Sequence, residues 1–91
     1  MDEIKAGQQQ AKGVAAQSLL ESEILKAAFA HLEAEYLKTW RYETRVRDVE
    51  ARERLWTAVH ILHKVQDHLK QWVIDGKIAG RDLANMKYIK R

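Results

Sequence analysis

Histidines and acidic side chains are the residues of this sequence whose spacing comes closest to metal chemistry. His60, His63 and Asp67 follow one another at intervals of three and four, so they share one face of a helix. An earlier segment adds three candidate ligands, His31, Glu33 and Glu35. A zinc site needs three or four ligands at about 2.0–2.2 Å. We favour ordinary surface or interface histidines and predict no metal or cofactor, because His60 and His63 lie outside the apolar stripe and HExxH is absent.

A tryptophan extends this histidine face toward the N-terminus. Trp56 precedes His60 by four residues, so it continues the same helical face. Exposed aromatic side chains are enriched at protein interfaces. We therefore predict that a stripe of four residues contacts a protein partner: Trp56, His60, His63 and Asp67. The alternative is that Trp56 merely covers the edge of a helix pair.

Catalysis has little support in the sequence. The chain contains no cysteine, which excludes cysteine nucleophiles, cysteine-ligated zinc and disulfides and suits a reducing compartment. The GxSxG, Walker and GxGxxG motifs are absent. A pair of helices also lacks the concave pocket that most enzymes use. We expect a protein that is not an enzyme.

The C-terminal tail is the most basic segment of a chain whose net charge is only +3. Between residues 77 and 91, five basic side chains accompany one acidic side chain, so the segment carries +4. Basic side chains bind phosphates and an aromatic ring can stack on a base. The candidate nucleic-acid contacts are Lys77, Arg81, Lys87, Tyr88, Lys90 and Arg91. A solubilising end is the favoured interpretation, since no RNP, KH, zinc-finger or helix-turn-helix motif accompanies the tail.

Long helices must position these residues, because the chain has no proline and its four glycines lie near the two ends. Ser18 and Glu21 form a capping box that predicts a helix over about 19–42. Its apolar residues recur at intervals of four, three and four: Leu25, Phe29, Leu32 and Tyr36. Residues 1–17, with three consecutive glutamines and two glycines, are predicted to form a flexible arm or a frayed helical extension.

A second helix is predicted over about 48–75 from a heptad repeat. Two apolar sets recur every seven residues with an offset of three: Leu55, Leu62 and Leu69, and Ala58, Val65 and Trp72. Asp48 is the candidate N-cap, and Gly76 is the candidate stop at the C-terminal end. Residues 78–86 are expected to form one short third helix.

The two predicted helices have similar lengths and a short connection, which is typical of antiparallel neighbours. We therefore expect an all-α fold with an antiparallel two-helix hairpin over 18–76, an arm over 1–17 and a basic tail or short helix over 77–91. A short chain has little stability to spare, and one hairpin cannot cover the aromatic surface present. We expect a homo-oligomer, with a dimer favoured, whose apolar stripes form the core of a helical bundle.

Four segments together resemble small helical proteins encoded among the structural and packaging genes of tailed bacteriophages. They are Leu-Leu-Glu-Ser-Glu-Ile-Leu at 19–25, Arg-Glu-Arg-Leu-Trp at 52–56, His-Leu at 68–69 and Gly-Lys-Ile-Ala at 76–79. The resemblance is one of pattern and contains no catalytic motif. It implies a phage-encoded accessory or virion-associated protein, and it assigns no functional residues.

Together these features predict a non-catalytic protein–protein interaction module that self-associates, binds a partner protein, or does both. The alternative is a nucleic-acid-binding accessory protein that uses the basic tail. No apolar run approaches the roughly 18–20 residues of a membrane span, and the N-terminal residues do not form a secretory signal. The expected location is the cytoplasm, which is the host's if a phage encodes the protein, with the virion as a further possibility.

Overall fold

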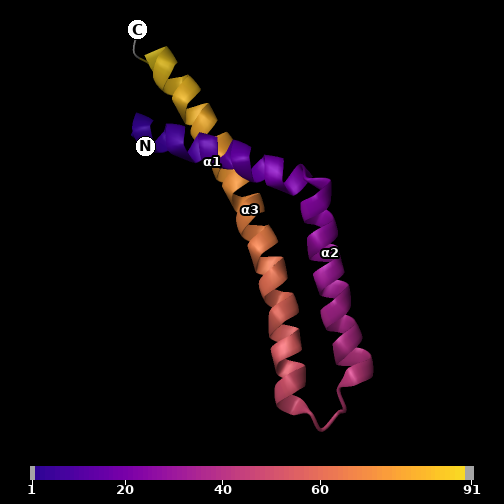
Figure 1. Ribbon diagram of the computed structural model, residues 1–91. Coiled ribbons are helices and arrows are strands. Elements are labelled where there is room, and N and C mark those ends of the chain that lie inside the picture. Colours follow the sequence, from indigo (N-terminus) through magenta and orange to yellow (C-terminus); the bar gives the residue numbers. More distant parts are fainter. Residues whose placement is uncertain (1, 90–91) are drawn as a thin grey trace. The chain divides into compact units, whose positions relative to one another are not determined.

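The computed structural model describes residues 2–89, with side chains described as far as Met86. The helices are α1 (Glu3–Glu21), α2 (Glu23–Lys38) and α3 (Val49–Ile89), and a π-helical turn (Thr39–Glu43) follows α2 (Figure 1). No strand occurs between residues 2 and 89, so the predicted all-α class is confirmed for that part of the chain. Within the same residues, no helix combines the length and apolar character needed to cross a membrane.

Helix α1 occupies the segment that was predicted to be an arm or a frayed extension. The Asp2 carboxylate accepts a hydrogen bond from the Ile4 amide at 2.8 Å, and the Asp2 carbonyl accepts one from the Ala6 amide at 2.9 Å. Gly7 and Gly13 lie inside this helix, although each glycine costs about 1 kcal/mol of helix propensity relative to alanine. Gly13 packs directly against the α3 backbone at Trp72 and Gly76, which is a physical reason for a glycine at this position.

The predicted helix start at Ser18 is wrong, because α1 continues through it to Glu21. The break falls at Ser22, whose backbone is extended (φ −66°, ψ 118°) and whose Oγ accepts from the Leu25 amide at 3.3 Å. Glu21 does not complete the expected capping box and instead accepts from Gln17 Nε2 at 3.1 Å. Both serines can cap a helix, and only the second one does so.

The helices divide into two compact units. In the described chain, residues up to Glu21 pack with those from Asp67 onward, and we call this the terminal unit. The central unit comprises Ser22–Gln66, and α3 contributes to both units. This grouping differs from the segments 1–17, 18–76 and 77–91 that the sequence suggested, because the N- and C-terminal segments pack together.

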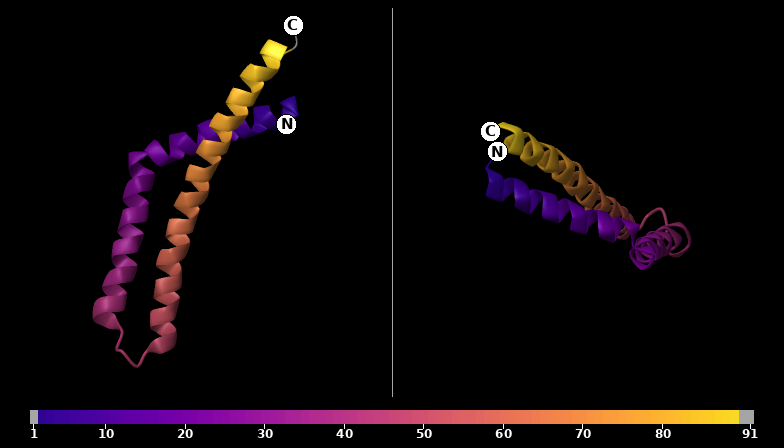
Figure 2. Two further views of the ribbon diagram at one scale, coloured as in Figure 1. Left: turned by 180° about the vertical axis from the view of Figure 1, so that it is seen from behind. Right: turned by 90° about the horizontal axis from the view of Figure 1, so that it is seen from above.

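In the central unit, α2 and the first part of α3 lie side by side (Figures 1 and 2). The connection spans residues 44–48. The predicted bounds at 42 and 48 agree to within a residue with the end of the π-helical turn and the start of α3, whereas α2 itself ends at Lys38. Asp48 directly precedes α3, and its carboxylate accepts from the Arg45 amide at 2.7 Å, which fastens the loop. Residues between the two helices are half-buried: Leu25, Phe29 and Tyr36 on α2, and Leu55, Val59 and Leu62 on α3.

The predicted helix end at Gly76 is wrong, because α3 continues to Ile89 through both Gly76 and Gly80. The short third helix expected over 78–86 is therefore the last part of α3. A glycine ends a helix when it adopts a positive φ, and Gly76 does not adopt one. It serves close packing instead.

The terminal unit is built around a close approach of α1 and α3. A Cβ atom placed on Gly13 would lie 2.8 Å from the Trp72 carbonyl oxygen and 2.9 Å from the Gly76 Cα atom. Three alanines are also buried in this unit: Ala6, Ala16 and Ala79. Lys12 covers the Trp72 ring with its ammonium group 4.7 Å from the ring centroid. Small residues thus let two helix backbones touch, and Gly76 is fixed by that contact.

Candidate functional site

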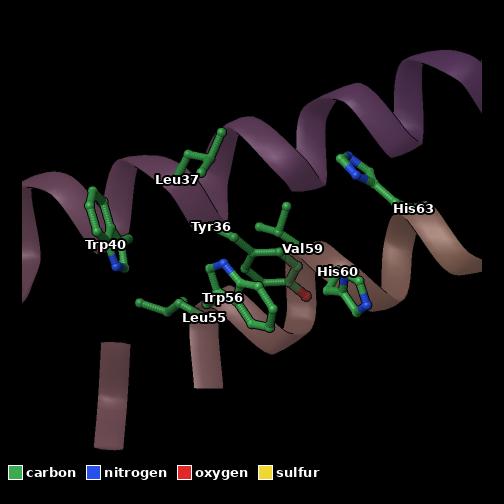
Figure 3. A pocket seen from close by; sticks show the side chains of 8 residues that line it. All are labelled: Tyr36, Leu37, Trp40, Leu55, Trp56, Val59, His60 and His63. Carbon is green, nitrogen blue, oxygen red and sulfur yellow. The ribbon is translucent and has the colours of Figure 1, made fainter. Parts of the chain in front are cut away.

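The central unit carries an apolar groove between α2 and α3. Its volume is about 340 Å³. Three of its lining residues come from α2 and the π-helical turn, and five come from α3 (Figure 3). They are Tyr36, Leu37, Trp40, Leu55, Trp56, Val59, His60 and His63. Aromatic and aliphatic side chains dominate this set, which is typical of surfaces that bind another molecule by burying apolar area.

Trp56 is the most exposed large hydrophobic side chain of the groove, with 65% of its surface accessible. Its ring stacks on His60, one helical turn later, with centroids 5.2 Å apart and an interplanar angle of 10°. This i, i+4 stack holds the indole in a defined orientation on the helix surface. The groove therefore presents an ordered aromatic side chain to solvent.

Arg52 contacts Trp40, one of the residues that line the groove. Its guanidinium lies 4.0 Å from the centroid of the Trp40 ring, a cation–π contact. Its Nη1 also donates to the Trp40 carbonyl oxygen at 3.1 Å and to Thr44 Oγ1 at 2.9 Å. Trp40 lies in the π-helical turn, and this kind of turn is frequent at functional sites. Arg52 thus fixes the wide turn, and Trp40 with it, against the first part of α3.

Glu33 and His63 join the two helices farther from the loop. His63 Nε2 lies 2.5 Å from Glu33 Oε1, with 54% and 36% of the two side chains accessible. The contact is a hydrogen bond when the histidine is neutral with its proton on Nε2, and an ion pair when it is protonated. Pairs this exposed contribute at most about 1 kcal/mol, so this contact aligns the helices more than it stabilises them.

Three of the four residues predicted to contact a partner line the groove. Trp56, His60 and His63 are brought together with Tyr36 and Trp40 of the other helical segment. The fourth, Asp67, is exposed, belongs to the terminal unit and does not line the groove.

Sequence reasoning missed the α2 side of this surface. It assigned Tyr36 to the core and gave no role to Leu37, although both line the groove. The usable signal was the spacing of Glu33, Leu37 and Trp40, at intervals of four and three. That spacing places them on one face of α2, as Trp56, His60 and His63 share one face of α3.

The residues predicted to form a core are only partly covered within one chain. Leu69 is buried, with 8% accessible, whereas Leu32, Val65 and Trp72 keep 40%, 43% and 38% of their surface. The remaining predicted members are half-buried: Leu25, Phe29, Tyr36, Leu55 and Leu62. Among the described residues, no large side chain is fully buried. The apolar stripes therefore have surface left to cover.

The other candidate sites stay dispersed. In the part of the chain that the structure describes, no group of three histidine or acidic side chains could hold a metal ion. His31 lies 3.5 Å from Glu35 within its own helix. Lys77 and Arg81 are exposed. Of the other proposed nucleic-acid contacts, the side chains of Lys87 and Tyr88, together with Lys90 and Arg91, lie outside the described residues.

Comparisons with protein-family models, with curated proteins and with solved structures find no match to this chain. The groove and the stripes must therefore be interpreted from their own chemistry.

Proposed function

We propose that this protein is a non-catalytic protein–protein interaction module whose central unit is a helical hairpin that self-associates. In this proposal two copies pair, and their four helical segments form a bundle. Binding of a different protein partner is compatible with the same surface chemistry. A phage-encoded accessory or virion-associated role, acting in the host cytoplasm or the particle, is the biological setting that the sequence resemblance suggests.

The observation that carries this proposal is the amount of apolar surface that one chain leaves exposed. The described chain buries no large side chain completely, and Trp56, Leu37 and Trp40 keep 65%, 48% and 37% of their surface exposed. A chain of this size has few other sources of stability, and the sequence has no cysteine for a disulfide. Covering this surface with a second helical pair would supply the missing burial.

The width of the apolar stripe on α3 supports the same proposal. Leu55 and Leu62 lie half-buried beside α2, whereas Trp56 and Val65 are exposed. In a bundle, each helix packs against two neighbours, so its apolar stripe must be wider than that of a helix that packs against one. The stripe of α3 has this width, and α2 covers only part of it.

The first experiment is the absolute mass in solution, measured by size-exclusion chromatography with light scattering at low and high salt. We expect a dimer at both, because an apolar contact depends little on screening. A monomer at every concentration tested would contradict self-association. A dimer that forms only at low salt would contradict an apolar interface.

A further inference from the structure

We propose that the second copy docks groove to groove, with Trp40 and Trp56 at the centre of a two-fold interface. The inference rests on the proposed self-association and specifies its surface. Heptad analysis alone would place the contact on the opposite flank of α3, around Ile61 and Val65. The geometry of the groove face favours the tryptophan side.

Shape is the first argument. In a two-fold dimer the same patch meets itself, so it must contain both a projection and a hollow to receive it. Trp40 and Trp56 border the groove of about 340 Å³ and also a second hollow of about 220 Å³ on the loop side. Val46 and Val49 line that second hollow and are 87% and 57% exposed. An aromatic ridge between two apolar hollows meets the requirement for self-complementarity.

Extent is the second argument. Trp40 is 37% and Trp56 65% exposed, which together amount to roughly one tryptophan surface, or about 150–250 Å². Twelve different residues line the two hollows, which is about half of the 20–30 that each partner contributes to a standard interface. The patch thus suits the apolar centre of a dimer contact, around which polar residues form the rim. Tryptophan, tyrosine and arginine are also the residue types that dominate binding energy at such centres.

Charge is the third argument. A patch that meets its own copy must not carry an excess of one sign, because like charges would then face each other. Arg52 and Glu53 oppose each other in sign within the lining, and Glu33 is engaged by His63. This balance favours a second copy over nucleic acid or a strongly charged protein.

The opposite flank also has a hollow, of about 400 Å³, but it lacks an aromatic centre. Ile61 is 53% exposed, but the hollow beside it is lined mainly by polar and charged side chains: Glu50, Glu53, Arg54 and Thr57. No aromatic residue lines it. Ile61 therefore provides a matched control, since it is a large exposed apolar residue on the same helix.

The test compares Trp56→Ala and His60→Glu with Ile61→Ala in the full chain, by sedimentation equilibrium over a concentration series. Circular dichroism checks the fold of each variant, and all three positions are exposed enough to leave it intact. We expect Trp56→Ala to raise the dimer dissociation constant at least about thirtyfold, as for a central interface residue. His60→Glu should do the same by placing two like charges together, and Ile61→Ala should change it less than about threefold.

Two outcomes would overturn the inference in different ways. A wild-type dimer that survives both groove substitutions but dissociates with Ile61→Ala would place the second copy on the opposite flank, and self-association would stand. A wild-type chain that remains monomeric throughout would contradict both the interface and the proposed self-association.

Discussion

The terminal and central units bring helices together by different means. In the terminal unit, glycine and alanine let two backbones touch, and the contact is closed, with Ala6 and Ala79 wholly inaccessible. In the central unit, the helices meet through leucine, phenylalanine and tyrosine side chains that are only half-buried. The small residues complete the contact between α1 and α3 within one chain, whereas the large side chains between α2 and α3 stay partly exposed. We therefore place the proposed interaction surface in the central unit, where the large apolar side chains between the helices remain partly exposed.

We expect the largest effect from a substitution that disrupts the contact between α2 and α3 in the central unit. Leu62→Asp places a carboxylate between α2 and α3, where Leu62 is half-buried, and desolvating an unpaired charge is unfavourable. We expect loss of folding or of assembly, visible as reduced helical circular dichroism or a monomeric mass. Lys64→Asp, an exposed position two residues away, is the control and should leave both unchanged. An unaltered melting curve for Leu62→Asp would show that the contact between the helices is wrongly assigned.

We expect an intermediate effect from a substitution at the close approach of α1 and α3 in the terminal unit. Gly13→Ala should lower the free energy of unfolding by about 1–3 kcal/mol, because the new Cβ meets backbone atoms that cannot move aside. Gly7→Ala is the matched control on the same helix, with nothing within 4 Å of the added methyl group. It should stabilise the chain by up to about 1 kcal/mol through helix propensity alone. Urea titration measures both, and equal effects in the two variants would argue against the close approach.

We expect the smallest effect from removing the helix cap at Ser22, where the central unit begins. Ser22→Ala removes the oxygen that accepts from the Leu25 amide, and loss of such a cap costs about 1 kcal/mol. Ser18→Ala should be neutral or slightly stabilising, because Ser18 lies inside α1 and alanine is the better helix former. Thermal melts compare the two. A larger loss from Ser18→Ala would restore the capping box that the sequence suggested.

The features that depend on local sequence were predictable. The absence of proline predicted the helical class, and the candidate N-cap Asp48 predicted the start of the second helix to within one residue. The helical spacing of Trp56, His60 and His63 was enough to group three residues that do line the groove. Each of these predictions needed only neighbours within two helical turns.

The features that depend on distant residues were not predictable in the same way. Gly76 has the sequence properties of a helix end, and only its contact with Gly13 shows that it belongs inside a helix. The same contact involves α1, in the segment that glycines and glutamines had suggested was an arm. Ser18 and Ser22 are equally good caps by type, and the choice between them is not set by the serines alone.

The pairing of Gly13 with Gly76 also has a consequence for how this sequence can diverge. Each glycine is held by the backbone of the opposite helix, so neither position can acquire a side chain unless the helices move apart. Over evolutionary time the two positions should therefore change rarely, and together, while Gly7 drifts freely. In a search for distant relatives, two glycines with this separation would be more diagnostic than the leucine heptads, which many unrelated helical proteins share.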